Sequence, residues 1–252
     1  MQLWQPPNTG VLCDLLARLE SCYVLGNGSN LLATDGELSR PVVSTRHCTG
    51  MQVFDGGLYL EAGCMMPRVV SQLPRLRLSG IEYFASIPGT LGGAVFMNAG
   101  RGRGYRRSIS QVVDYVDIFD RTTNSLQRLS ATECQFEYRH SIFHTRPEWV
   151  ILGAQLCLSP ESEDAIRHNI RGRLEFTKAR QDLRLPNAGT TFSSVSEVGQ
   201  LRRLMGTRIG DAAYSTKTVN WVVNQGAATY SNVEQLLELA PAGSQLEWSV
   251  WR

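Results

Sequence analysis

Apolar residues recur in two different periods along the first quarter of the chain. Apolar positions at helical spacing predict an amphipathic helix over residues 8–20, capped by Asn8 or Thr9. The apolar run Tyr23–Leu25 predicts a strand, and residues 41–63 predict several short strands around a turn that holds two glycines. Helices and strands therefore alternate here, as in an α/β lobe.

The same alternation continues to the end of the chain. A charged, turn-like stretch at residues 160–164 interrupts it and marks an expected domain boundary. The other expected elements are, in order, a helix over residues 66–79, strands over 112–120, 125–129 and 149–158, helices over 165–180 and 195–205, a strand over 220–224, a helix over 232–239 and a strand over 245–251.

Two glycine-rich segments carry the strongest chemical signal. The first, VLGNGSNLL over Val24–Leu32, follows a predicted strand, and backbone N–H groups in such a turn form an anion-binding concavity. The second, GIEYFASIPGTLGGAVFMNAG over residues 80–100, carries no charge after Glu82. Glycine lets a backbone approach a flat or phosphorylated ligand closely because it has no Cβ.

The first segment does not fit a common nucleotide-binding motif. It lacks the Gly-Lys-Ser/Thr of a P-loop, and the GxGxxG spacing fails at Leu31. A tight turn between strands is an alternative for this segment taken alone. Two loops of different design in one chain together suggest a long cofactor that is contacted at both ends.

Together with three further segments, these loops resemble the UDP-N-acetylenolpyruvoylglucosamine reductase family of the vanillyl-alcohol-oxidase-like FAD-binding superfamily. The further segments are CQFEYRHSIF over Cys134–Phe143, LPNAGTTF over Leu185–Phe192 and VNWVVNQGAATYSNV over Val219–Val233. The resemblance spans nearly the whole chain. It implies an α+β fold, with a two-lobed FAD-binding domain of the vanillyl-alcohol-oxidase type and a C-terminal α+β substrate-binding domain.

The resemblance also implies domain boundaries, cofactors and contact residues. The FAD-binding domain would cover residues 1–160, with lobes over 1–52 and 53–160, and the substrate-binding domain residues 163–252. FAD would be bound noncovalently, with NADPH as a possible reductant. Residues implied to contact FAD are Leu25, Gly26, Asn27, Gly28, Ser29, Asn30, Leu31, Pro88, Gly89, Thr90, Gly92, Gly93, Asn98, Tyr138 and Arg139. Residues implied to contact the substrate are Tyr138, Asn187, Lys217 and Asn224.

One catalytic position of the family maps onto a matching motif, and a second maps onto a segment that departs from the family's motif after Gly189. The family's arginine, which stabilises developing negative charge, corresponds to Arg139 in Tyr138-Arg139-His140-Ser141. The family's proton-donating serine corresponds to Thr190, whose β-branched side chain is stiffer at χ1. His140 is expected to point away from the site, because neighbours on an extended segment face opposite sides.

The family's third catalytic residue, a glutamate near the C-terminus, corresponds to Ser249. Glu247 keeps a carboxylate two positions earlier, and residues i and i+2 of a strand over 245–251 would share one face. Glu247 is therefore a candidate acid from a displaced position, and a solvent-facing glutamate is the alternative.

A basic loop follows Asn98-Ala99-Gly100, where the family has a small neutral turn. Its arginines are Arg101, Arg103, Arg106 and Arg107. Four arginines can clamp a phosphate or a carboxylate, and a solvated loop is the alternative.

Composition argues against several other classes of protein. The formal net charge of +2 disfavours a dedicated nucleic-acid binder, and no apolar stretch approaches the ~20 residues of a membrane span. The six cysteines form no CxxC pair, so no metal site is expected. Reduced thiols in a cytoplasmic protein are the simplest account of them. The sequence does not indicate which oligomeric state the protein has.

Three functions are compatible with these residues. Because Thr190 and Ser249 replace family residues while the cofactor loops remain, we expect an FAD-dependent oxidoreductase with an altered substrate or chemistry. One alternative is the genuine NADPH-dependent reductase of peptidoglycan precursor synthesis, which acts on a nucleotide sugar. The other is a flavin-binding subunit without catalysis, against which the intact Tyr138-Arg139 argues.

Overall fold

The computed structural model describes residues 2–101 and 107–252. The chain forms two compact units: the first combines Met1–Asn27 with Arg40–Leu174, and the second combines Gly28–Ser39 with Glu175–Arg252. The first glycine loop is thus divided between the units after Asn27. The division lies beyond residues 160–164, because the chain passes from one unit to the other within the helix α4 (Glu163–Arg180).

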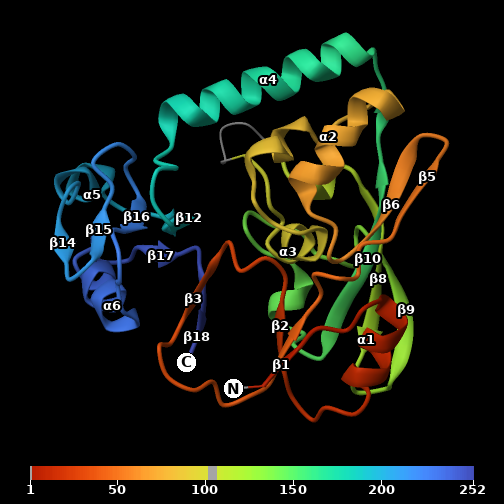
Figure 1. Cartoon of the computed structure of the whole chain (residues 1–252), viewed down its shortest axis with the longest axis horizontal. Coiled ribbons are helices and arrows are strands. Elements are labelled where there is room, and N and C mark those ends of the chain that lie inside the picture. The colour runs from red at the N-terminus through yellow and green to blue at the C-terminus, as the bar shows by residue number, and fades with distance from the viewer. Residues whose placement is uncertain (1, 102–106) are drawn as a thin grey trace. The chain divides into compact units, whose positions relative to one another are not determined.

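A five-stranded antiparallel sheet forms the centre of the first unit, in the order β5–β6–β10–β8–β9 (Figure 1). Its strands are β5 (Met51–Phe54), β6 (Gly57–Glu61), β8 (Val113–Asp120), β9 (Ser125–Ser130) and β10 (Trp149–Cys157). Gly56 has a φ of 78° between β5 and β6, so the turn expected there is confirmed.

Helices cover both faces of this sheet. Ile151 of β10 packs into a core shared with α2 (Met66–Leu76) and α3 (Leu91–Phe96). Its neighbour Val150 faces the other side and packs with α1 (Thr9–Leu16). The two faces explain the almost uninterrupted apolar character of β10.

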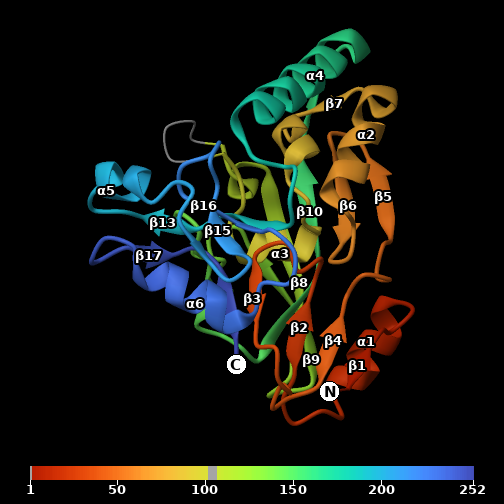
Figure 2. The ribbon, with the colours of Figure 1, turned by 60° about the vertical axis from the view of Figure 1, so that its left-hand side comes forward.

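A small parallel sheet has the order β1–β4–β2, and the first glycine loop follows β2 directly. Its strands are β1 (Leu3–Trp4), β2 (Tyr23–Leu25) and β4 (Val42–Ser44), and Figure 2 shows β2 beside β4. The strand expected over Tyr23–Leu25 is confirmed. The remaining short elements of this unit are β7 (Leu78–Ser79), β11 (Ser159–Pro160) and the 3-10 turns η1 (Glu82–Ser86), η3 (Ile109–Gln111) and η4 (Ile142–His144).

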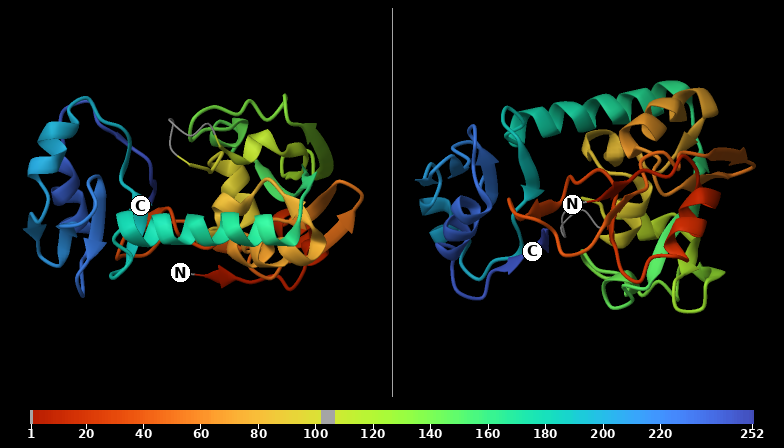
Figure 3. Two further views of the ribbon diagram at one scale, coloured as in Figure 1. Left: turned by 90° about the horizontal axis from the view of Figure 1, so that it is seen from above. Right: turned by 60° about the horizontal axis from the view of Figure 1, so that its bottom comes forward.

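The second unit is built on a four-stranded antiparallel sheet of order β12–β16–β15–β14. Its strands are β12 (Asn187–Thr190), β14 (Arg208–Ile209), β15 (Ala212–Tyr214) and β16 (Trp221–Asn224). Two further strand pairs, β13–β17 and β3–β18, comprise β13 (Phe192–Ser194), β17 (Gln245–Leu246), β3 (Leu31–Ala33) and β18 (Ser249–Trp251). Its helices are α5 (Val198–Arg203) and α6 (Tyr230–Glu238), and Figure 3 shows α6 in dark blue against the blue strands.

Several helices end elsewhere than the periodicity predicts. α1 stops at Leu16, and the carbonyl of Leu19 instead accepts a hydrogen bond from Arg121 Nη2 at 2.7 Å. α2 stops at Leu76, because the next residue, Arg77, adopts a left-handed φ of 51° and caps the helix. α5 is shorter than its expected range of 195–205. None of the helices in the described residues has the length and apolar character needed to cross a bilayer.

Candidate active site

The start of the first glycine segment contacts the second glycine segment within the first unit. The side-chain amide of Asn27 donates to the carbonyl of Pro88 at 2.5 Å. A Cβ at Gly26 would lie 2.6 Å from the hydroxyl of Thr90, so only glycine lets the loops approach this closely. Segments that are distant in sequence therefore form one wall, as the hypothesis of a shared cofactor requires.

The second segment is better ordered than a loop. Thr90 accepts a hydrogen bond from the Gly93 N–H at 3.4 Å and thereby caps α3. The carbonyl of Gly89 accepts from the Met66 N–H at 3.0 Å, which ties the segment to the start of α2. The interpretation as a continuous glycine loop is thus wrong from Leu91 onward, because capping and packing on the sheet outweigh the low helix propensity of glycine.

Two adjacent glycines of α3 differ in what surrounds them. A Cβ on Gly92 would lie 3.1 Å from the Cβ and 3.2 Å from the carbonyl of Ala62. A Cβ on Gly93 would meet only the Thr90 hydroxyl, at an ordinary 3.6 Å. Packing within the protein therefore explains Gly92 but not Gly93, as expected if Gly93 faces a ligand.

Asn98 and Arg139 join the end of the second segment to the Tyr138-Arg139 motif. The Asn98 amide donates to the carbonyl of Glu137 at 2.7 Å, and its oxygen accepts from the Ser110 N–H at 3.2 Å. In return, Arg139 Nη2 donates to the carbonyl of Gly100 at 3.1 Å. Asn98 is 6% exposed. Its amide thus supports the turn that carries Arg139.

The Arg139 turn is a tight hairpin and not an extended segment. Glu137 and His140 pair across it, and Arg139 itself has a left-handed φ of 58°. The expected geometry for His140 is therefore wrong. Its ring stacks on His144 at 4.6 Å, while the Arg139 guanidinium lies 5.1 Å from the Tyr138 ring centre. Left-handed backbone is unfavourable for arginine, so the fold holds this residue under constraint.

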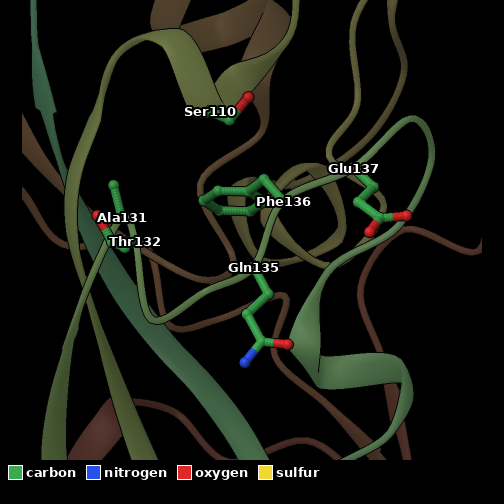
Figure 4. A pocket seen from close by; sticks show the side chains of 6 residues that line it. All are labelled: Ser110, Ala131, Thr132, Gln135, Phe136 and Glu137. Atoms are coloured by element: carbon green, nitrogen blue, oxygen red, sulfur yellow. The ribbon is translucent and has the colours of Figure 1, made fainter.

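A shallow, open depression of about 550 Å³ lies beside this hairpin. Figure 4 shows Phe136 between Ser110 and Gln135, with the carboxylate of Glu137 at one side. Ala131 and Thr132 complete its lining. Asn98 bonds to the backbone of both Ser110 and Glu137, so it links two walls of the depression.

The second half of the first glycine loop is anchored in the second unit. Asn30 donates through its amide to the carbonyl of Glu247 at 3.0 Å, and its own carbonyl accepts from the Ser249 N–H at 3.0 Å. Leu31 and Ser249 are partners in the parallel β3–β18 pair. Gly28 has a φ of 69°, a conformation that favours glycine. Asn30, a residue of the first glycine segment, therefore contacts the backbone of both C-terminal candidates, Glu247 and Ser249.

These contacts correct the expected geometry of Glu247 and Ser249. The single strand predicted over 245–251 is broken: β17 pairs with β13, whereas β18 pairs with β3. The Glu247 N–H donates to the carbonyl of Thr191 at 2.8 Å. Because the strand changes partner at Glu247 and Trp248, the rule that i and i+2 share a face does not apply here.

Thr190 lies at the end of β12, opposite Trp221 of β16. Gly189 before it has a φ of 80°, and its N–H donates to Asn187 Oδ1 at 3.1 Å. Sequence reasoning missed Asn220, whose amide bonds to both the N–H and the carbonyl of Phe192, each at 2.8 Å. Asn220 thereby closes the segment that carries Thr190.

The remaining predicted substrate residues occupy two different turns of the second unit. Lys217 donates through Nζ to the carbonyl of Lys178 near the end of α4, at 2.6 Å. Asn224 Oδ1 accepts from the N–H groups of Gly226 and Ala228, at 2.9 and 3.1 Å. The side-chain oxygen of Asn224 thus holds the turn that follows it.

The donor groups suit an anionic cofactor. Neither Gly26–Leu31 nor Pro88–Asn98 contains an acidic residue, and both offer neutral donors such as Asn27 and Thr90. Backbone N–H groups and neutral side chains of this kind bind phosphates without charge repulsion. Within the residues that the structure describes, no three His, Cys, Asp or Glu side chains gather as a metal site would require.

The basic loop after Gly100 lies mostly outside the described residues, which exclude Arg103 and Arg106. At its base, the Arg101 N–H donates to the carbonyl of Arg107 at 2.8 Å. The expected anion clamp remains a prediction.

Comparisons with known proteins agree with this geometry. Residues 15–130 match the family described as FAD binding domain. UDP-N-acetylenolpyruvoylglucosamine reductase of Pseudothermotoga lettingae is 32% identical over 94% of this chain and 84% of its own length. The enzyme of that name from Synechococcus sp. is 34% identical, over 95% of this chain and 78% of its own.

A solved structure extends the likeness to three dimensions. The crystal structure of UDP-N-acetylenolpyruvylglucosamine reductase from Thermus caldophilus covers 99% of this chain and 92% of its own, with a TM-score of 0.83 and 29% identity. The α+β FAD-binding fold that the sequence resemblance implies is thereby confirmed. The chain belongs to the UDP-N-acetylenolpyruvoylglucosamine reductase family and is an FAD-dependent oxidoreductase.

Proposed function

We propose that the protein reduces the enolpyruvyl double bond of a nucleotide sugar of the UDP-N-acetylenolpyruvoylglucosamine type, with NADPH as reductant. The names of its relatives supply this substrate. FAD, when bound, would supply the hydride that NADPH provides. The chain's own residues would bind the substrate, stabilise charge and deliver a proton.

The observation that carries the proposal is the constrained Arg139. Its left-handed backbone and its bond to the Gly100 carbonyl fix a cation at the end of the cofactor segment. Such a preorganised cation stabilises the carboxylate and the negative charge that develops next to it during reduction. The Tyr138 ring packs beside the same guanidinium and would contact the substrate.

Thr190 would donate the proton from its hydroxyl to the substrate carbon. A hydroxyl is a weak acid, so its donation depends on placement and on the cation that stabilises the carbanion. Trp221 pairs with Thr190 across the sheet, and Asn220 holds the backbone of Phe192 two residues later. Glu247, tied to Asn30 and Thr191 through its backbone, would provide the negative charge that the family places at position 249.

The two glycine segments would hold FAD. Gly26 to Leu31 and Pro88 to Gly93 would hold the phosphates and the ring, and Asn187, Lys217 and Asn224 would bind the nucleotide sugar. On this proposal, residues 1–160 serve FAD and residues 163–252 serve the substrate. A cytoplasmic location belongs to the same proposal and agrees with six cysteines that form no disulfide.

A second candidate is an oxidoreductase of the same fold with another substrate. It is favoured by one observation: Thr190 and Ser249 replace the serine and glutamate expected at these positions. The extra methyl of Thr190 and the missing carboxylate at Ser249 would then fit a ligand other than the enolpyruvyl sugar.

Steady-state NADPH oxidation distinguishes the two candidates. The proposal expects oxidation that depends on UDP-N-acetylenolpyruvoylglucosamine. It also expects Arg139→Ala to lose about 3 kcal/mol of transition-state stabilisation, the scale for one oxyanion-stabilising donor. A matched double change, Thr190→Ser with Ser249→Glu, is the comparison. Activity only in the double variant would support the second candidate and refute the first.

A further inference from the structure

A buried acidic residue outside every motif organises the polar contacts of the second unit. Asp182 is 2% exposed. Its carboxylate accepts from Arg184 through Nε at 2.9 Å and Nη2 at 3.0 Å, and from the Ser215 hydroxyl at 2.7 Å. Its carbonyl accepts from the Trp221 indole N–H at 3.1 Å. A buried charge is costly unless it is paired and hydrogen-bonded, and here both conditions are met.

Only one assignment of hydrogen-bond donors and acceptors is possible in this cluster. Hydrogen bonds from Arg184 and Ser215 outweigh burial and hold the pKa of Asp182 well below its usual range, so its carboxylate only accepts. The single hydroxyl proton of Ser215 must therefore point to Asp182. Its lone pairs are left to accept from the N–H groups of Lys217 and Thr218, at 3.0 and 3.1 Å.

The turn held in this way has a second attachment, at the end of α4. Lys217 Nζ donates to the carbonyl of Lys178 at 2.6 Å, and the Thr218 hydroxyl donates to that of Arg180 at 3.0 Å. These bonds fix the backbone and the ammonium group of Lys217 together. The ammonium group keeps further N–H donors beyond this bond.

The same cluster reaches the strand that carries Thr190. The Asn187 amide donates to the carbonyl of Asp182 at 3.4 Å, and Trp221, which also bonds to that carbonyl, pairs with Thr190. Three of the proposed active-site positions therefore share one buried support.

We propose that Asp182 and Ser215 are positioning residues for the nucleotide-sugar substrate, which hold the turn of Lys217 so that its ammonium group is fixed for the anionic part of that ligand. The inference rests on the proposed function for the identity of the ligand. The support itself, from the carboxylate through the hydroxyl to two backbone N–H groups, is independent of it.

Hydrogen exchange tests the support in the full-length, flavin-loaded protein. Ser215→Ala is the principal variant, because Arg184 still pairs Asp182 and no charge is stranded. We expect the amides of Lys217 and Thr218 to exchange about tenfold faster, the scale of one lost hydrogen bond. Glu234→Gln, which alters an exposed ion pair with Arg252, should leave them unchanged. Unaltered protection in Ser215→Ala would overturn the proposal.

Calorimetric titration with UDP-N-acetylglucosamine tests the link to the ligand. Ser215→Ala and Lys217→Ala should each weaken binding about tenfold, and the double variant should bind no more weakly than Lys217→Ala, because coupled residues are non-additive. Additive losses, or unchanged binding by Ser215→Ala, would overturn the positioning role. If the unaltered protein did not bind the probe, the proposed function and the ligand part of this inference would both fall. The hydrogen-exchange measurement would still show whether Ser215 holds the backbone of Lys217 and Thr218.

Discussion

Single residues of the cofactor wall show why glycine occurs where it does. At Gly26 a side chain would collide with the Thr90 hydroxyl, and at Gly92 it would crowd Ala62. At Gly93 neither restriction applies. The absence of a side chain at Gly93 is therefore best explained by a ligand, and this is testable because a methyl group there should not disturb the protein itself.

Gly93→Ala should fold at least as stably as the unaltered protein and lose bound flavin. Alanine in a helix is more stable than glycine by roughly 0.5–1 kcal/mol, whereas its methyl would block the approach of the cofactor. Thermal unfolding and the flavin absorbance of the purified protein measure the two effects. Gly199→Ala in α5, where an added Cβ meets nothing within 4 Å, is the matched control. Full flavin occupancy in Gly93→Ala would rule out this assignment.

Asp182 predicts a pH-dependent contribution to stability. Its folded pKa is depressed, so its stabilisation is present above the ordinary aspartate pKa of about 3.9 and is lost as the pH falls through the folded value. Asp182→Asn should cost about 2 kcal/mol at pH 7, less than a fully buried pair because the Arg184 side chain is 69% exposed. Urea unfolding should show this cost shrinking below pH ~4. An equal cost at pH 7 and pH 3 would contradict the account.

At the scale of elements, the sequence predicts local structure better than pairing. Strand Tyr23–Leu25 and the turn at Gly56 follow from nearest neighbours, and both are confirmed. The change of partner at Glu247 depends on β3 and β13, which lie far away in the chain, so alternation within residues 245–251 contains no sign of it. The same holds for the bond between Asn98 and Glu137, on which the placement of Arg139 depends.

Asn220 should contribute strongly to the element that carries Thr190. Asn220→Ala removes two hydrogen bonds to Phe192 and places alanine at a φ of 62°, so we expect a loss of about 2–3 kcal/mol in the free energy of unfolding. Asn220→Gly tolerates that φ and should lose less. Urea denaturation of the two variants separates the loss of the hydrogen bonds from the strain of the left-handed backbone. Equal losses would mean that backbone strain contributes nothing.

At the scale of the whole molecule, motif order was sufficient to predict the family and the cofactor. The catalytic positions, by contrast, depend on contacts that no local motif encodes. The first glycine loop, for example, is divided between two compact units after Asn27, and its local motif gives no sign of this division. The burial of Asp182 is a second example. A single acidic residue in a polar stretch gives no sign of burial, which depends on the contacts with Ser215 and Trp221 in the folded chain.

The reoxidation of the enzyme-bound flavin tests the central claim most directly. The purified protein should release FAD on denaturation. After anaerobic reduction by NADPH and removal of NADP, the flavin absorbance of the intact protein should return on addition of UDP-N-acetylenolpyruvoylglucosamine. UDP-N-acetylglucosamine, which lacks the enolpyruvyl group, should leave the flavin reduced. A flavin that stays reduced with the enolpyruvyl sugar, in a protein that binds it, would contradict the proposed reaction.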